Sequence, residues 1–251
     1  MKKWISLLAA LILIGYSSML VSCDASKYAP NGLEYKVNED GKTCTIVGIG
    51  KCTDTVVTVP QKIGKYQVTG IGKEAFCAPK DQVSEFCASI TKFILPDGLI
   101  TIESSAFLGC TALTDLVIPN SVTTVGASAF YECTNLKALT LSEGLTVISS
   151  NMCCGCTALE SIVIPNSVTK IDESAFLQSG LKQVTLGTSV LEIKGFAFHS
   201  FFAFPSFCYS GTLEQWKDIS VDPPMVADYE ESVLKCTDVE IILQEVYYGK
   251  Q

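Results

Sequence analysis

Apolar and polar positions along the middle of this 251-residue chain recur with a fixed period. Pro96 and Pro119 are 23 residues apart, Pro165 follows after twice that distance, and Ser142 stands at the intermediate place. Self-similarity at this spacing is typical of stacked units that bury their apolar faces against their neighbours. The period therefore predicts a solenoid in which each repeat forms one coil.

Four columns of apolar residues define the predicted core. Two are aliphatic, one is aromatic in every unit but the fourth, and one opens a short strand that alternates apolar and polar residues. In the fourth unit Met152 and Cys153 replace an Ala–Phe pair, which we interpret as repacking at similar volume. The columns are Val68, Leu99, Val122, Leu145, Val168 and Val190; Ile71, Ile102, Val125, Ile148, Ile171 and Ile193; Phe76, Phe107, Phe130, Cys153, Phe176 and Phe198; and Ile90, Leu113, Leu136, Leu159 and Leu181.

Short segments on either side of the repeats predict caps. Residues 33–37, 43–49 and 55–59 alternate like three strands, and residues 233–234 and 239–243 are suited to final strands. Between them, Thr212 to Gln215 resembles a capping box that opens a helix with Leu213, Trp216 and Ile219 on one face. We expect this helix to cover the open end of the stack, because an uncapped coil exposes apolar side chains and strand edge.

The first residues have the features of a bacterial export signal. Lys2 and Lys3 precede an apolar run over 4–14 that is too short to cross about 30 Å of hydrocarbon. The following Leu-Val-Ser-Cys resembles a lipobox, in which Cys23 is acylated and becomes the mature N-terminus. In the alternative, ordinary cleavage, Cys23 is a spare thiol in a discarded leader.

The predicted organisation is a strand-rich repeat solenoid of the α/β type, with about six units of ~23 residues between two caps. We expect a signal peptide over 1–22, a tether over 23–31, an N-terminal β cap over 32–67, repeats over 68–205 and a C-terminal cap over 206–251.

The charge of the chain disfavours nucleic acid as a partner. Its formal net charge is -8, and loss of residues 1–22, which carry two lysines and no acid, makes it about -10. Affinity for nucleic acid depends on Lys and Arg replacing phosphate counterions. We therefore expect no nucleic acid to bind.

Two departures from the period have alternative interpretations. Eight residues are inserted near Cys77 to Ser84, where they form either a binding element or a tolerated surface loop. A later Phe-rich segment forms either an exposed adhesive patch or a wedge that closes the last coil. That segment contains Phe196, Phe198, Phe201, Phe202, Phe204 and Phe207.

The 12 cysteines do not predict a metal centre. Cys153, Cys154 and Cys156 lack paired CxxC spacing and a nearby histidine, so we expect no zinc. A disulfide is most favoured between Cys44 and Cys52, which are close in sequence. Four cysteines at one repeat position are instead expected to be buried thiols that pack as small hydrophobes. These are Cys87, Cys110, Cys133 and Cys156.

The sequence contains no convincing catalytic constellation. Its one histidine, His199, has no nucleophile or acid at motif spacing, so we expect it to be structural. Gly48-Ile49-Gly50-Lys51 lacks the spacing of a phosphate-binding loop. We therefore expect neither an enzyme nor a cofactor.

The repeat units IPNSVTTVGASAFYECTNLKAL and IPNSVTKIDESAFLQSGLKQV resemble the BspA-like leucine-rich repeats of bacterial surface lipoproteins. The flanks GLEYKVNEDGKTCTIVGIGKCTDT and CYSGTLEQWKDI resemble that family too. The resemblance implies a right-handed solenoid at the cell surface, and adhesion to host proteins is attributed to some members. Pro-Asn-Ser stands where ordinary leucine-rich repeats begin their asparagine ladder, so no ligand residues can be transferred from those proteins.

Residues that point away from the columns form two parallel rows, one of mixed polarity and one mainly β-branched. Such a strip is suited to recognising an extracellular protein or glycan, although an ordinary solvated sheet face has the same alternation. A structural spacer or envelope-assembly component is the alternative function. The strip consists of Lys92, Ile94, Asp115, Val117, Ala138, Thr140, Ser161, Val163, Gln183 and Thr185.

Overall fold

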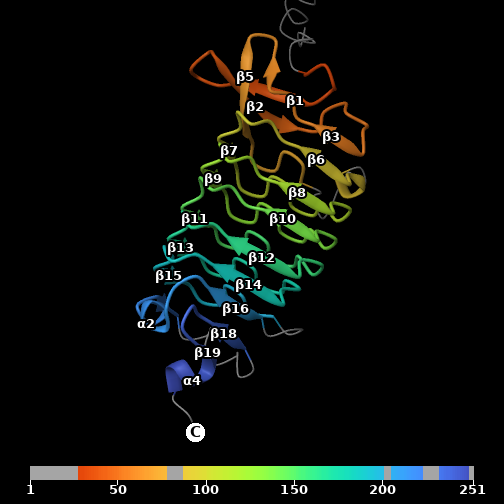
Figure 1. Ribbon diagram of the computed structural model, residues 1–251. Helices are drawn as coiled ribbons and strands as arrows, with labels where there is room; N and C mark the ends of the chain where they lie inside the picture. The colour runs from red at the N-terminus through yellow and green to blue at the C-terminus, as the bar shows by residue number, and fades with distance from the viewer. Residues whose placement is uncertain (1–27, 78–86, 201–204, 223–231, 249–251) are drawn as a thin grey trace, which may run out of the picture.

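The computed structural model describes residues 28–77, 87–200, 205–222 and 232–248. The chain winds through a stack of coils, and successive coils place their strands side by side in two ladders (Figure 1). Turns connect these strands in the repeats, so helix is confined to short segments. The predicted strand-rich solenoid is confirmed.

The first ladder contains the short strands that follow the fourth apolar column, the one from Ile90 to Leu181. Its neighbouring strands run parallel, because each coil repeats the path of the one before. An antiparallel strand, β19 (Glu240–Ile242), ends it. The parallel strands are β3 (Val56–Thr58), β6 (Lys92–Ile94), β8 (Asp115–Val117) and β10 (Ala138–Thr140), then β12 (Ser161–Ile164), β14 (Gln183–Leu186), β16 (Ser206–Tyr209) and β18 (Val233–Lys235).

The second ladder runs along another side of the coils. At its N-terminal end, β1 (Glu34–Val37) pairs antiparallel with β2, and β4 (Lys62–Ile63) pairs antiparallel with β5. Its parallel strands are β2 (Thr43–Gly48), β5 (Tyr66–Ile71), β7 (Thr101–Ile102) and β9 (Thr124–Val125), then β11 (Val147–Ile148), β13 (Lys170–Ile171), β15 (Glu192–Ile193) and β17 (Ser220–Val221). Its strands β5, β7, β9, β11, β13 and β15 each end on a residue of the second aliphatic column.

The four predicted columns form the core and are buried throughout. Phe76, Phe107 and Phe130 stack with ring centroids 5.4 Å apart, and Phe176 stacks on Phe198 at 5.3 Å. Cys153 is fully buried between these two stacks, as the repacking interpretation requires. Burying one such ring contributes about 2 kcal/mol to stability.

A third side of each coil is a tight turn without strands. Here the residue two positions before each member of the aromatic column, Cys153 included, is left-handed, with φ of 54 to 59° at Glu74, Ser105, Ser128, Asn151, Ser174 and Phe196. Backbone hydrogen bonds still join the coils on this side, for example from Phe107 N to Ala129 O at 2.8 Å and from Cys153 N to Ala175 O at 2.7 Å.

Both ladders are interrupted between the same two coils. Strand pairing in the described chain stops at β10 and resumes at β12 in the first ladder, and it stops at β9 and resumes at β11 in the second. The third side stays bonded there, since Phe130 N donates to Met152 O at 2.9 Å. We call this interruption, between strands β9 and β10 and strands β11 and β12, the seam.

The repeat-position cysteines are buried, as predicted. The Sγ atoms of Cys110, Cys133 and Cys156 each donate to the carbonyl of the previous coil's column phenylalanine, at 3.4, 3.2 and 3.1 Å. Burial raises the pKa of Cys110 and Cys133 above the usual thiol range. These thiols therefore act as small apolar residues that also tie adjacent coils together.

The predicted disulfide between Cys44 and Cys52 is wrong. Both are buried free thiols. Cys44 lies in β2, opposite Val68 of β5, whereas Cys52 lies in the turn after that strand. Closeness in sequence did not bring the two thiols together, because β2 carries Cys44 into the core of its own coil.

The strands expected in the N-terminal cap are present as β1, β2 and β3. Two of them are not separate from the repeats, because β2 pairs in parallel with β5 and β3 with β6. The final strands expected near the C-terminus are present as β18 and β19.

The helix predicted from the capping box is α2 (Leu213–Lys217), in which Thr212 accepts from Gln215 N and donates its own N–H to Gln215 Oε1. Its Trp216 is fully buried against Phe207 and Tyr209. It does not cover the end of the stack as expected, because it connects β16 to β17 inside a coil. Beyond it lie β18, β19 and α4 (Leu243–Tyr248) (Figure 1).

In the Phe-rich segment, Phe198 and Phe207 are buried and meet edge to face at 5.4 Å, which agrees with the wedge interpretation. Phe196 is 40% exposed. The leader with Cys23, the inserted residues 78–84, and Phe201, Phe202 and Phe204 lie outside the described residues. A 3-10 turn, η2 (Cys87–Ser89), follows the insertion. None of the helices described is both long and apolar enough to cross a membrane.

Candidate functional site

The ten residues of the predicted strip lie on the outer side of the first ladder, and we call this surface the strand face. Inward and outward positions alternate along each strand, so Leu116 and Ile162 are buried while their neighbours face solvent. Asp115 and Thr185 are half-buried, and the other eight residues of the strip are exposed.

One row of the strand face is apolar and unusually exposed. Val117 and Val163 each keep 64% of their surface accessible, and Ile94 keeps 47%. Thr140 lies beside Val117, and Thr185 lies beside Val163. Side chains of this kind on a regular sheet contribute little to folding while they remain in water, and they stabilise a complex when a partner covers them.

The other row is polar. Lys92 and Asp115 approach to 3.6 Å across β6 and β8, and both are about half exposed. Water screens such a pair, so it contributes little to stability. Ala138, Ser161 and Gln183 complete the row, so it mixes a methyl group with hydroxyl, amide and charged groups beside the apolar row.

The strand face is hollowed where the seam crosses it. A shallow groove of about 270 Å³ lies between β10 and β12. Thr140 and Val163 bring the β-branched row into it, and Lys137 and Glu143 add charge at its border. The seam therefore places a recess in the middle of an otherwise regular surface.

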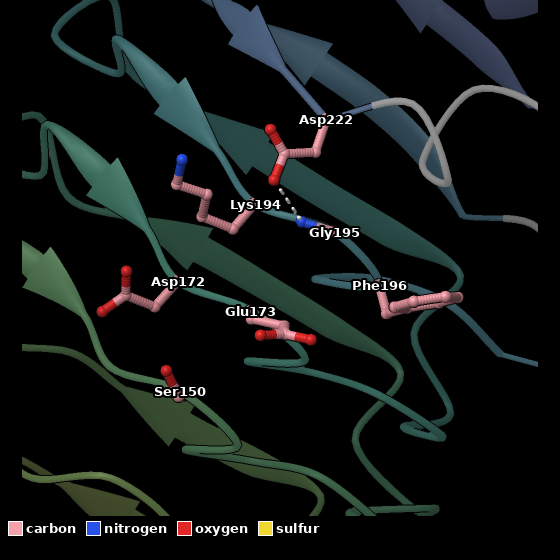
Figure 2. Close-up of a pocket in the computed structure, with 7 residues that line it drawn as sticks. All are labelled: Ser150, Asp172, Glu173, Lys194, Gly195, Phe196 and Asp222. Carbon is pink, nitrogen blue, oxygen red and sulfur yellow. Dashed lines mark hydrogen bonds between the residues drawn. The ribbon is translucent and has the colours of Figure 1, made fainter.

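A second site, which the sequence did not predict, lies beyond the C-terminal ends of four second-ladder strands. It is a groove of about 460 Å³, and we call it the acidic groove. Figure 2 shows its side chains arriving from successive coils. Its lining consists of Ser150, Asp172, Glu173, Lys194, Gly195, Phe196 and Asp222.

Ion pairs within the chain occupy much of the charge at the acidic groove. Lys170 Nζ lies 2.9 Å from Asp172 Oδ1 and 3.7 Å from Glu192 Oε2, and Lys194 Nζ lies 2.5 Å from Glu192 Oε1. The carboxylate of Asp172 raises the pKa of Lys170. The hydrogen bond between Lys194 and Glu192 lowers the pKa of the Glu192 carboxyl and raises the pKa of the Lys194 ammonium.

Asp222 has a structural role at one wall. Its Oδ2 accepts from Gly195 N at 3.2 Å (Figure 2). Glu103 makes the same kind of bond to Lys73 N at 2.9 Å, near the other end of the ladder. In both places, a carboxylate that follows a strand of the second ladder accepts a hydrogen bond from a backbone N–H of the preceding coil.

Two groups at the acidic groove remain available to a ligand. The carboxylate of Glu173 is exposed and makes no hydrogen bond or ion pair within the described part of the chain. The ring of Phe196 is 40% exposed and meets His199 edge to face at 5.7 Å. From the sequence, Phe196 stood out only as part of the Phe-rich segment. The position after the second aliphatic column, where Glu103, Asp172 and Lys194 stand, varies in charge along the chain, and this variation is the sequence signal that could have indicated the site.

Across the described ranges, no three His, Cys, Asp or Glu side chains gather so as to hold a metal ion. His199 lies beside Phe196, and its carbonyl accepts from Gln178 N at 2.8 Å. These contacts are those of a residue that joins two coils.

Comparison with protein families gives one match. Residues 80–202 match the BspA-type leucine-rich repeat region in six copies. These residues are BspA-type leucine-rich repeats. Leucine-rich repeat proteins are typically binding scaffolds. A search of curated proteins found no significant match.

Solved structures of bacterial proteins, several of them described as leucine-rich repeat proteins, share the fold. The T. pallidum leucine-rich repeat protein TpLRR is 22% identical with a TM-score of 0.57, over 74% of this chain and 87% of that one. A leucine-rich repeat protein from Eubacterium ventriosum is 25% identical with a TM-score of 0.56, over 70% of this chain and 44% of that one. The pneumococcal vaccine antigen PcpA is 19% identical with a TM-score of 0.52, over 82% and 69%.

Proposed function

We propose that this BspA-type repeat protein is a non-enzymatic binding protein of the bacterial cell envelope, and that its strand face recognises an extracellular protein or glycan. The observation that carries the proposal is the exposed β-branched row, in which Val117 and Val163 are each 64% exposed. An extended apolar row beside a polar row fits a partner that lies along the coils.

Surface display is part of the proposal. A lipid on Cys23 anchors the chain, and residues 24–31 separate the solenoid from the membrane. The family match and the likeness to PcpA, which is described as a vaccine antigen, support an exposed location. Mass spectrometry of the mature N-terminus tests the anchor, because acylation at Cys23 adds the mass of the lipid and ordinary cleavage does not.

The double variant Val117→Lys/Val163→Lys tests the strand face. Two charges placed in the row should reduce binding at least tenfold, because a partner that covers them must desolvate both. The measurement is a binding screen of residues 24–251 against extracellular-matrix proteins and glycans, followed by titration of each hit.

Leu191→Lys is the matched control. Leu191 is also 64% exposed, but it lies next to β15 on the second ladder. It should leave binding unchanged, and thermal unfolding should show that all variants stay folded. Equal binding by the double variant and the wild type would remove the strand face from consideration.

A structural spacer in the envelope is the alternative, since the regular coils also set a fixed length. This alternative predicts no ligand in the screen. It also predicts that crosslinking in cells recovers envelope neighbours and no host molecules.

A further inference from the structure

The acidic groove combines three features that occur together nowhere else among the described residues. It has a volume of about 460 Å³, an exposed carboxylate on Glu173 and an exposed ring on Phe196. We propose that it is a second binding site, which takes an arginine side chain of a protein partner. Glu173 pairs with the guanidinium, and the plane of the guanidinium lies on the ring of Phe196.

The charge of the lining fits a cation. When the ion pairs at the groove are counted with its lining, Asp172, Glu173, Glu192 and Asp222 supply four carboxylates against the two ammonium groups of Lys170 and Lys194. Lys194 is held at Glu192, so it does not neutralise Glu173. The protein as a whole is acidic, with a formal net charge of -8, and this favours the approach of basic partners.

Phe196 gives the groove its aromatic wall. It stands at the left-handed position of its coil, with φ of 59°. The same position holds Glu74, Ser105, Ser128, Asn151 and Ser174 in the other coils, all of them small or polar. The ring is therefore a property of this groove and not of the repeat.

Arginine fits these groups better than lysine does. Its planar guanidinium presents parallel N–H groups to a carboxylate and stacks on an aromatic face, whereas an ammonium is a compact, strongly hydrated charge. The groove lies at the second ladder and the strand face at the first, so the two sites can be tested separately (Figures 1 and 2).

The test titrates residues 24–251 with the capped peptide acetyl-Gly-Arg-Gly-amide and follows binding by NMR. Its lysine and norleucine analogues are measured in parallel. The arginine peptide should shift the backbone signals of Gly195 and Phe196, the lysine peptide should bind more weakly, and the norleucine peptide should not bind. Raising the salt concentration should weaken binding of the arginine peptide.

Three variants locate the site. Glu173→Gln and Phe196→Ser should each weaken arginine-peptide binding by about fivefold or more, and Phe196→Tyr should restore it. Ser is the natural residue at this position in three other coils, so Phe196→Ser should keep the fold. Glu143→Gln, which removes an exposed carboxylate elsewhere, should have no effect.

Absence of binding by the wild type would overturn the proposal. Equal binding of the norleucine peptide, or equal losses in Glu173→Gln and Glu143→Gln, would do the same. The double variant Val117→Lys/Val163→Lys should keep arginine-peptide binding, so failure of the strand face and failure of this site are distinguishable.

Discussion

The turn on the third side of each coil imposes a conformational free-energy cost on single residues. The turn on the third side has a left-handed residue two positions before the residue of the aromatic column, and in four coils another left-handed residue follows four positions later. Gly109 and Gly155 occupy this second position without strain, whereas Glu132 and Gln178 adopt φ of 56° with a side chain. Left-handed conformation costs a non-glycine residue about 1 kcal/mol.

Replacing Gln178 with glycine should therefore stabilise the protein. We expect Gln178→Gly to raise the free energy of unfolding by about 1 kcal/mol, because Gly reaches this conformation freely. The backbone bond from its N–H to His199 O does not depend on the side chain. Urea denaturation measures the change. Gly155→Ala is the reciprocal control and should destabilise, and a loss of stability in Gln178→Gly would contradict the account.

Buried thiols predict a loss of stability in alkali. Burial raises the pKa of Cys44 from 9.0 to about 11. Between these values the unfolded chain releases the thiol proton and the folded chain keeps it, so the stabilising effect is complete below pH 9 and is lost as the pH rises toward 11. Urea midpoints from pH 7 to 11 test this. Cys44→Ala should show a shallower decline than the wild type, and equal slopes would contradict the assignment.

At the scale of elements, the seam divides an otherwise continuous pair of ladders. Across the seam, the coil with β9 and β10 and the coil with β11 and β12 share no strand pairing in either ladder, and backbone hydrogen bonds join them on the third side. The aromatic column is also interrupted there, since Cys153 stands between Phe130 and Phe176. Fewer shared bonds lower the free energy needed for local opening.

Hydrogen exchange should reveal this difference. We expect the amides of residues 139–141 and 161–163 to exchange faster than those of 115–117 and 184–186, because β10 and β12 are paired on one side only, whereas β8 and β14 are paired on both. Mass spectrometry with peptide-level resolution measures both groups in one sample. Uniform protection along the first ladder would show that the seam is as stable as its neighbours.

The sequence predicted the coils because each buried column repeats at one position, as the column from Val68 to Val190 does. It predicted the strand face for the same reason, since outward positions follow from inward ones. It did not predict the seam, because pairing between β10 and β12 depends on how two coils sit against each other. The acidic groove was missed because its lining comes from separate coils.

At the scale of the whole molecule, the repeats place function on surfaces that the core does not determine. The columns form the buried core of the stack, and the two ladders present different chemistry on different sides. The strand face offers an apolar row, and the acidic groove offers a carboxylate and an aromatic ring. A partner can therefore contact several coils at once, as expected for a repeat scaffold.

Photo-crosslinking in cells tests the central claim most directly. A benzophenone group in place of the Val117 side chain reports what lies on the strand face, and one in place of Leu191 is the control at equal exposure. We predict a crosslink from position 117, and none from position 191, to one extracellular protein or glycan-bearing molecule. Crosslinks only to envelope neighbours, or equal crosslinks from both positions, would contradict recognition through the strand face.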